Sequence, residues 1–279
     1  MNVALVGVTS SITKALIPLF GSKAEIITIG RKDADIVIDL YNPIEQVVLK
    51  KDIDVMIHTS AHFGGVTYEA ISEAVMINIL GALKMLHAAS DADVKHFVYI
   101  SSIYSHLKPS SNLYSVYSVT KRSSEEVLKL YCKGKDIKLT ILRPSQIYGN
   151  LESNRINQPF FYSIIQKVKN NQEVVFYGTH DPVRNFIHID DVAEIIYKVV
   201  EKGIEGDFDC VFKDNITFTQ IARAAKLAFK SNSEILFDES KPDIEDNTTQ
   251  INTLLYDLID YYPKITIEEG MRRLASLHE

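Results

Sequence analysis

The sequence predicts an α/β protein built on a doubly wound parallel sheet. Short β-rich runs alternate with helical patterns through the first half of the chain, which is typical of strand–helix–strand units. Several of these runs are continuously apolar, as expected of strands that helices cover on both faces. Because such connections cross over in the right-handed sense, they build a doubly wound sheet.

Six β-rich runs are expected to form the strands of this sheet. In chain order they are 2–7, 25–30, 35–39, 54–60, 96–102 and 137–144. The helical patterns between them cover 11–19, 43–50, 68–90 and 114–134. We therefore expect one domain over residues 1–150.

After residue 150 the alternation loosens. The expected elements are loops at 150–159 and 179–186, a helix at 160–171, a strand and helix over 186–200, and a polar surface loop at 238–249. We expect the first domain to take in about 187–205 as well. Residues 151–279 are then mainly a smaller C-terminal lobe.

Composition narrows the class of protein. The 279 residues are 46% hydrophobic and 24% charged, as in soluble globular proteins, and the net charge of −6 argues against a nucleic acid or an anionic membrane as the main partner. The two cysteines, Cys132 and Cys210, lie in no metal-binding pattern, so no disulfide framework and no metal site are expected. No apolar run of membrane-spanning length and no signal peptide stand out, so a cytoplasmic location is expected.

The first turn raises a question about phosphate binding. A dinucleotide loop of the form G-x-x-G-x-x-G places glycines at positions 7, 10 and 13, whereas this chain has Gly7, Ser10 and Thr13. Gly7 permits the tight turn, and the two hydroxyls and the helix N-terminus suit an anion. By itself, the stretch fits a phosphate cradle and an ordinary strand–turn–helix equally well.

Polar residues gather where the strands end, and ligands bind outside the carboxyl ends of the strands in such sheets. The tips read Gly30-Arg31-Lys32, Asp39-Leu40, Thr59-Ser60-Ala61-His62, Ser101-Ser102 and Arg143-Pro144-Ser145.

A tyrosine and a lysine four residues apart follow one of these tips. The spacing Y-x-x-x-K occurs at Tyr104/Lys108, Tyr117/Lys121 and Tyr131/Lys135. The first pair runs into a proline and the third straddles a glycine, so only Tyr117 and Lys121 share a helix face shortly after a serine-tipped strand. A nearby ammonium favours the phenolate of a tyrosine, and with Ser102 the pair can move a proton while a cofactor moves hydride.

With its motifs in this order, the chain resembles extended short-chain dehydrogenases/reductases of the NAD-dependent epimerase/dehydratase type. The motifs are "DVMIHTSA" (54–61), "NILGALKMLHAA" (78–89), "HFVYISS" (96–102), "YSVTK" (117–121), "LRPSQIYG" (142–149), "RNFIHIDDVA" (184–193) and "ITIEEGMRRL" (265–274). The resemblance implies a Rossmann-like domain, a C-terminal substrate-binding lobe and a nucleotide-sugar substrate. It also implies a homodimer formed through the helices at 68–90 and 114–134.

The same resemblance assigns the site residues. Tyr117, Lys121 and Ser102 are the expected catalytic residues, with Ser101 replacing Ser102 if the register is off by one. The expected cofactor-binding residues are Gly7, Thr9, Ser10, Ser11, Ile12, Arg31, Lys32, Asp39, Leu40, Ser60, Ala61, Asn78, Lys121 and Pro144. The expected substrate-binding residues are His62, Ser102, Tyr104, Gln146 and Arg184, with Arg184 on the diphosphate.

Some roles have two interpretations. His62 either reaches the substrate or packs in its loop beside Phe63, and His188 is expected to be structural. Asp190 and Asp191 are expected to cap the helix that follows them rather than to bind a metal.

The charged residues at the end of the second expected strand indicate which of NAD and NADP binds. Members that prefer NAD carry an acidic residue there, whereas Arg31 and Lys32 suit the 2′-phosphate of NADP. A solvated turn is the alternative. NADP is therefore the expected cofactor, with NAD as the second choice.

The residues after Ser102 bear on the reaction. The 4,6-dehydratases of this family carry Asp-Glu there, whereas this chain has Ile103-Tyr104, so dehydration is not expected. Epimerisation and reduction of a keto sugar both stay open. A third possibility, from a different class, is a sensor or scaffold that binds a dinucleotide weakly.

Overall fold

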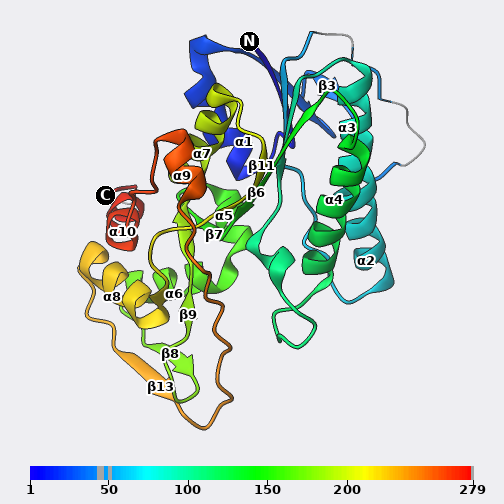
Figure 1. Cartoon of the computed structure of the whole chain (residues 1–279). Coiled ribbons are helices and arrows are strands. Elements are labelled where there is room, and N and C mark those ends of the chain that lie inside the picture. Colours follow the sequence, from blue (N-terminus) through cyan, green and yellow to red (C-terminus); the bar gives the residue numbers. More distant parts are fainter. Residues whose placement is uncertain (43–46, 50–51, 278–279) are drawn as a thin grey trace. The chain divides into compact units, whose positions relative to one another are not determined.

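The computed structural model describes residues 1–42, 47–49 and 52–277, and they form two compact units (Figure 1). The first unit comprises Met1–Pro144, Ala193–Cys210 and Leu254–Tyr261. The second comprises Ser145–Val192, Val211–Thr253 and Tyr262–Glu279. The chain therefore passes from one unit to the other repeatedly.

A seven-stranded parallel sheet forms the centre of the first unit, in the order β11-β6-β5-β4-β1-β2-β3. Its strands are β1 (Asn2–Val6), β2 (Glu25–Gly30), β3 (Ile36–Val37), β4 (Val55–His58), β5 (His96–Ile100), β6 (Lys138–Pro144) and β11 (Gly206–Cys210). Strands β4 and β5 are buried along their whole length, in agreement with their continuous apolar runs. The strand order reverses between β1 and β4, where doubly wound sheets bind ligands.

Helices cover both faces of this sheet. They are α1 (Ser11–Phe20), the 3₁₀ turns η1 (Gly21–Lys23) and η3 (Ile103–His106), α2 (Tyr68–Ala74), the π-helical η2 (Val75–Gly81), α3 (Ala82–Asp91), α4 (Val116–Cys132), the later part of α7 (Ile189–Lys202) and α9 (Leu254–Ile259). Figure 1 shows α3 and α4 on one face of the sheet and α1 on the other. Met85 and Leu128 pack from α3 and α4 into a core that contains Phe97 and Tyr99 of β5.

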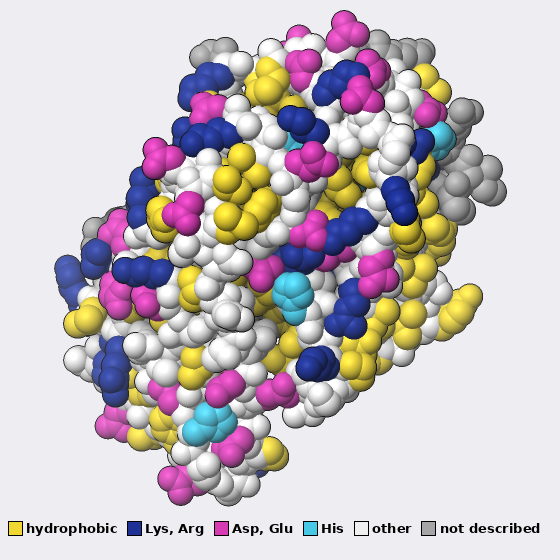
Figure 2. Space-filling view, in the orientation of Figure 1, with side chains coloured by type: hydrophobic (Ala, Val, Ile, Leu, Met, Phe, Trp, Pro, Cys, Tyr) yellow, Lys and Arg dark blue, Asp and Glu magenta, His cyan; other side chains and the backbone are white. Residues whose placement is uncertain are grey.

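The helical stretch Tyr68–Asp91 is long and apolar enough to cross a membrane by length and composition, and 33% of its most apolar window is buried. The expectation that no apolar stretch reaches this length is therefore wrong. Figure 2 shows hydrophobic side chains gathered along the edge where α2 lies, whereas acidic and basic side chains are interspersed over the rest of the visible face. Apolar side chains of α2 and η2, among them Ile71, Val75 and Leu80, are exposed.

The second unit is built from short strand pairs and helices. Its elements are β7 (Gln146–Tyr148), α5 (Glu152–Asn157), α6 (Pro159–Lys169), β8 (Val174–Tyr177), β9 (Val183–Arg184), β10 (Phe186–His188), the start of α7, β12 (Ile216–Thr217), α8 (Phe218–Phe229), β13 (Ile235–Asp238) and α10 (Ile267–Ser276). The pairs β7–β10 and β8–β13 are parallel, and β9–β12 is antiparallel. Helices α6, α8 and α10 bury Phe161, Ile221 and Met271 in one core.

Three expected elements differ from the structure. The expected loop at 150–159 contains α5, so the tertiary context outweighs the weak helix propensity of this polar run. The expected loop at 179–186 contains β9, which gains its partner from the distant β12. Of the helix expected at 43–50, only residues 47–49 are described by the structure, and they are not helical. Residues 43–46 and 50 lie outside the described residues.

Asp190 and Asp191 lie in the first turn of α7, and the Asp191 side chain also makes a tertiary contact. Its buried carboxylate accepts hydrogen bonds from the backbone N–H groups of Lys264 (3.2 Å) and Ile265 (2.9 Å), so it fastens the segment that leads into α10. Asp190 forms an ion pair with Arg273 of α10 at 2.9 Å. His188 is buried and its Nδ1 accepts a hydrogen bond from the Asp190 N–H, which agrees with a structural role.

Candidate active site

The turn after β1 lies at the point where the strand order reverses. Gly7 has a φ of +106°, and a Cβ at this position would lie 2.7 Å from Ser60 Oγ and 2.8 Å from Thr59 Oγ1. Only glycine fits both the backbone conformation and this close approach to the end of β4. Ser60 is half-buried and Ala61 exposed beside this turn.

The two replaced glycines have distinct structural roles. Ser10 is the N-cap of α1, and its hydroxyl accepts a hydrogen bond from the Ile12 N–H at 3.2 Å. Thr13 is fully buried, and its hydroxyl lies 2.9 Å from that of Thr59 in β4's continuation, so a hydrogen bond replaces glycine-mediated close packing. Thr9 is exposed, whereas Ser11 and Ile12 are buried.

The turn nevertheless fits a dinucleotide phosphate. No side chain projects from Gly7, and the first turn of α1 holds no acidic residue that would repel an anion. The backbone N–H groups at a helix N-terminus attract phosphate. The Ser10 hydroxyl already accepts from one of these N–H groups, so hydroxyl side chains replace glycines along this turn.

The ends of β2 and β3 and of β6 hold the other residues expected to bind the cofactor. Arg31 and Lys32 are exposed in the bend that follows β2. Asp39 accepts a hydrogen bond from the Tyr41 N–H at 3.0 Å, and Leu40 is buried. Pro144 ends β6 and is buried opposite Cys210 of β11.

Ser102, Tyr117 and Lys121 converge at the end of β5. Ser102 follows β5 and caps η3, and Tyr117 lies in the first turn of α4. The Ser102 side chain lies close enough to the Tyr117 hydroxyl to lower its pKa. The Lys121 Nζ lies 5.8 Å from the centre of the Tyr117 ring and donates to the Ile100 carbonyl (2.7 Å) and the Tyr99 hydroxyl (3.3 Å).

Burial dominates the protonation of this group. It raises the pKa of Tyr117 well above its ordinary value, although the Ser102 side chain lowers it. Burial also lowers the pKa of Lys121 to about 7, against the opposite effect of Glu125. Burial therefore sets the net direction for Tyr117, whose phenol is protonated at neutral pH, and the expected effect of Lys121 on Tyr117 stays a prediction.

Asn78 connects the loop after β4 to α4. It is buried in η2, and its amide donates to the His62 carbonyl (2.7 Å) and the Thr120 hydroxyl (2.9 Å) and accepts from the His62 N–H (2.8 Å). Thr120 is adjacent to Lys121, so Asn78 links the loop after β4 to the helix turn that carries Lys121. The π-helical segment that presents it was not predicted, although such segments are frequent at functional sites.

His62 is engaged within its own loop. Its Nδ1 accepts from the Gly64 N–H at 3.0 Å, and its Nε2 lies 3.5 Å from a carboxylate oxygen of Glu73. Of the two interpretations of His62, these contacts favour packing in the loop.

Two aromatic rings flank Tyr117. The ring of Phe63 stacks on it, with centres 4.9 Å apart and planes 30° from parallel, and Tyr104 lies edge-on at 6.4 Å. Sequence reasoning missed this contact of Phe63, because nothing in the loop sequence indicates which ring Phe63 meets.

The two remaining expected substrate-binding residues belong to the second unit. Gln146 donates to Gln158 at 3.0 Å, and its side-chain oxygen is buried with no hydrogen-bond partner among the described residues. Arg184 is buried in β9, donates to the carbonyls of Val183 and Glu245, and lies 5.6 Å from the ring centre of Phe218. A diphosphate role for Arg184 stays a prediction.

Comparison with known families gives a match over most of the chain. The family described as "NAD dependent epimerase/dehydratase family" matches residues 3–210. A putative UDP-glucose 4-epimerase of Methanocaldococcus jannaschii is 26% identical over 62% of this chain and 57% of its own length. The dTDP-D-glucose 4,6-dehydratase of Bos taurus is 24% identical over 79% of this chain and 66% of its own length. The match thus spans less than two thirds of either relative.

A further relative is matched over more of its length. The CDP-abequose synthase of Salmonella muenchen is 23% identical over 82% of this chain and 78% of its own. Among solved structures, the UDP-glucose 4-epimerase of Thermotoga maritima with UDP-glucose is similar, with a TM-score of 0.82, 19% identity, and coverage of 100% of this chain and 98% of that one. The UDP-glucose 4-epimerase of Thermus thermophilus with NAD gives 0.77 and 18%, covering 99% and 98%. These structures agree with the predicted doubly wound fold.

Proposed function

The chain belongs to the NAD dependent epimerase/dehydratase family, and we propose that it is an NAD(P)-dependent epimerase or reductase of a nucleotide-activated sugar. The observation that carries this proposal is the convergence of Ser102, Tyr117 and Lys121 at one strand end. A hydroxyl, a phenol and an ammonium at one point are the groups that proton exchange with a sugar oxygen needs.

Each residue has a distinct role in this proposal. The Tyr117 hydroxyl gives a proton to the reacting sugar oxygen or takes one from it, and the Ser102 hydroxyl hydrogen-bonds the same oxygen. Lys121 stabilises the phenolate that forms and holds the ribose of the cofactor. A nicotinamide cofactor, when bound, supplies the group that takes up and returns hydride.

The cofactor would be held by residues 7–12 after β1, by the tips at 31–32 and 39–40, and by 60–61, Asn78 and Pro144. In the second unit, Gln146 and Arg184 are the proposed contacts to the nucleotide sugar. The absence of an Asp-Glu pair after Ser102 makes dehydration the least suitable reaction.

Epimerisation and reduction differ in what happens to the cofactor. Purified protein would be incubated with UDP-, dTDP- and CDP-sugars and their 4-keto forms, and the products followed by NMR. An epimerase interconverts two sugars with no net change in cofactor, whereas a reductase oxidises one NADPH for each sugar. If no sugar of these classes reacts under either condition, the proposed function is wrong.

We propose NADP as the cofactor because Arg31 and Lys32 stand exposed at the end of β2. NADPH is expected to bind more tightly than NADH in a fluorescence titration. Replacing both residues by Ala removes charge-assisted hydrogen bonds to the 2′-phosphate, so NADPH binding should weaken about tenfold or more, with NADH unchanged. Lys133→Ala, at an exposed lysine after α4, is the control. Equal affinities for both cofactors, or an unchanged double variant, would refute the NADP assignment.

The same titration distinguishes the second candidate function. Ser10 caps α1 with its hydroxyl, and this contact favours a turn that binds a dinucleotide weakly. Absence of binding of either cofactor would make a sensor or scaffold the better description.

We also propose a homodimer formed through α2, η2 and α4, supported by the exposed apolar side chains of this face. Sedimentation is expected to give a mass of twice the 31.5 kDa chain. Replacing Val75 and Leu80 together by Glu places charges on the apolar face and should yield the monomer. Leu227→Glu, at an exposed position of α8, is the matched control and should leave the dimer intact. A monomeric wild-type protein would contradict the proposal.

A further inference from the structure

Among the residues that the structure describes, no carboxylate hydrogen-bonds the buried amine of Lys121. Its side chain is 1% exposed, and its Nζ donates to the neutral oxygens of Ile100 and Tyr99. A buried ammonium is unstable unless a negative charge faces it. The source of that charge determines whether Lys121 is charged at neutral pH, as stabilisation of a phenolate requires.

The groups that face Lys121 from each packed element identify this source. His58 of β4 is neutral at pH 7, because burial lowers its pKa to about 3, and burial keeps Tyr99 of β5 and Tyr117 of α4 protonated. Glu125 lies one helical turn after Lys121 on the same face of α4, and its charge raises the pKa of Lys121.

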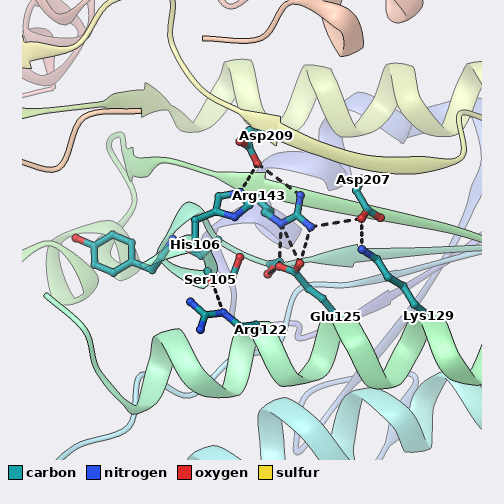
Figure 3. Close-up of polar contacts among 11 residues, drawn as sticks. Ser105, His106, Arg122, Glu125, Lys129, Arg143, Asp207 and Asp209 are labelled. Atoms are coloured by element: carbon teal, nitrogen blue, oxygen red, sulfur yellow. Dashed lines mark hydrogen bonds and ion pairs between the residues drawn. The ribbon is translucent and has the colours of Figure 1, made fainter. Parts of the chain in front are cut away.

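The carboxylate of Glu125 is fixed on its other sides. Arg143 of β6 donates hydrogen bonds to both oxygens (Figure 3). Its Nε lies 3.0 Å from Oε1 and 2.9 Å from Oε2, and its Nη2 lies 2.5 Å from Oε2. The hydroxyl of Ser101, the residue before Ser102, also donates to Glu125. Glu125 is 6% exposed, so this ion pair is shielded from solvent.

Arg143 does not neutralise Glu125 completely, because other carboxylates share it. Asp207 and Asp209 of β11 lie 3.5 and 3.6 Å from its guanidinium, and Figure 3 shows them approaching it from the side opposite α4. Lys129 also pairs with Asp207, and His106 lies 3.0 Å from Asp209. With histidine counted as neutral, this cluster holds three carboxylates and two cations, so it carries a net negative charge one helical turn from Lys121.

We propose that Glu125 is a positioning residue of the active site, which favours the charged form of Lys121 from one helical turn away and, through Ser101, fixes the strand end that carries Ser102. This role rests on the proposed function, in which Lys121 stabilises the phenolate of Tyr117. In the same proposal, Arg143, which Asp207 and Asp209 contact, holds the Glu125 carboxylate in one orientation.

The test compares two adjacent glutamates. Glu125→Gln and Glu126→Gln each remove one negative charge from α4, but Glu126 is exposed. In protein labelled with ¹³C at lysine Cε, with the Lys121 resonance assigned by Lys121→Arg, the titration midpoint of Lys121 should fall by one pH unit or more in Glu125→Gln. Glu126→Gln should leave it unchanged, and Glu125→Asp, which keeps the charge, should restore much of the difference.

Turnover provides the second readout. In Glu125→Gln, kcat at pH 7 should fall about fivefold or more with little change in KM for the sugar, because a midpoint one unit below 7 leaves about a tenth of Lys121 charged. The limb of the pH profile that depends on charged Lys121 should move to lower pH. A folded Glu125→Gln with an unshifted Lys121 midpoint, or an equal shift in Glu126→Gln, would overturn the proposal. If the wild type turns over no sugar but the midpoint shifts, the proposed function is wrong and the role of Glu125 in charging Lys121 stands.

Glu125→Gln leaves Arg143 without its bidentate partner, which destabilises the fold. A second variant therefore tests the proposal if Glu125→Gln does not fold. Glu125→Gln combined with Arg143→Gln removes one buried charge of each sign. Because Glu125 is the charge that acts on Lys121, the midpoint should still fall. A midpoint equal to that of the wild type would overturn the proposal here too.

Discussion

Tyr117→Phe is expected to reduce kcat by about 10²–10⁴-fold, the range that a positioned acid–base group contributes. The substitution removes the hydroxyl whose pKa Ser102 lowers and leaves the ring that stacks on Phe63. Cofactor affinity should therefore stay within a factor of about two, and stability within about 1 kcal/mol, which is the net value of one hydrogen bond. Steady-state kinetics, fluorescence titration and urea unfolding measure the three quantities.

The chain contains a control for this substitution. Tyr131 belongs to another Y-x-x-x-K pair, and its hydroxyl hydrogen-bonds His87 at 2.8 Å, away from Ser102. Tyr131→Phe should keep its turnover. Turnover of Tyr117→Phe within a few-fold of the wild type would show that the proton comes from elsewhere, and the acid–base role of Tyr117 would have to be abandoned.

Gly7→Ala is expected to destabilise the first unit by about 2–4 kcal/mol, from a positive φ combined with overpacking. The added methyl group would lie within 3 Å of the Thr59 and Ser60 side chains and of the Ser60 backbone N–H at 2.9 Å. Since the same turn is the proposed phosphate cradle, NADPH binding should be lost as well. Urea unfolding and fluorescence titration are the measurements.

Gly134→Ala separates the effect of the positive φ from the effect of overpacking. Gly134 has a φ of +77°, but a Cβ there would meet no atom within 4 Å. This variant therefore reports backbone strain alone, about 1–2 kcal/mol, and should bind NADPH normally. If the two variants were equally stable and bound NADPH equally well, the close approach at Gly7 would have no energetic consequence.

The sequence was most informative where the determining contacts are local. The strands of the sheet were predictable from continuous apolar runs, and Tyr117 with Lys121 from a helix pattern beside a strand tip. The helical segment α5 was not, because its residues have little helix propensity and the tertiary context decides their conformation.

Residues whose role depends on distant partners were also missed. Glu125 looks like an ordinary helix glutamate in the sequence, but β6 brings Arg143 to it, and β11 brings Asp207 and Asp209 to Arg143. Asp191 looks like a helix cap, and it also has partners more than seventy residues later in the chain. Spacing along one segment carries no information about either arrangement.

The repeated passage of the chain between the two units has a consequence for synthesis. Strand β11, which completes the sheet beside β6, is made only after Ser145–Val192 of the other unit, and Leu254–Tyr261 comes later still. Contacts between segments so far apart in sequence slow folding, because a long loop must close before they form. As the chain leaves the ribosome, neither unit can reach its final form until most of the other has been made.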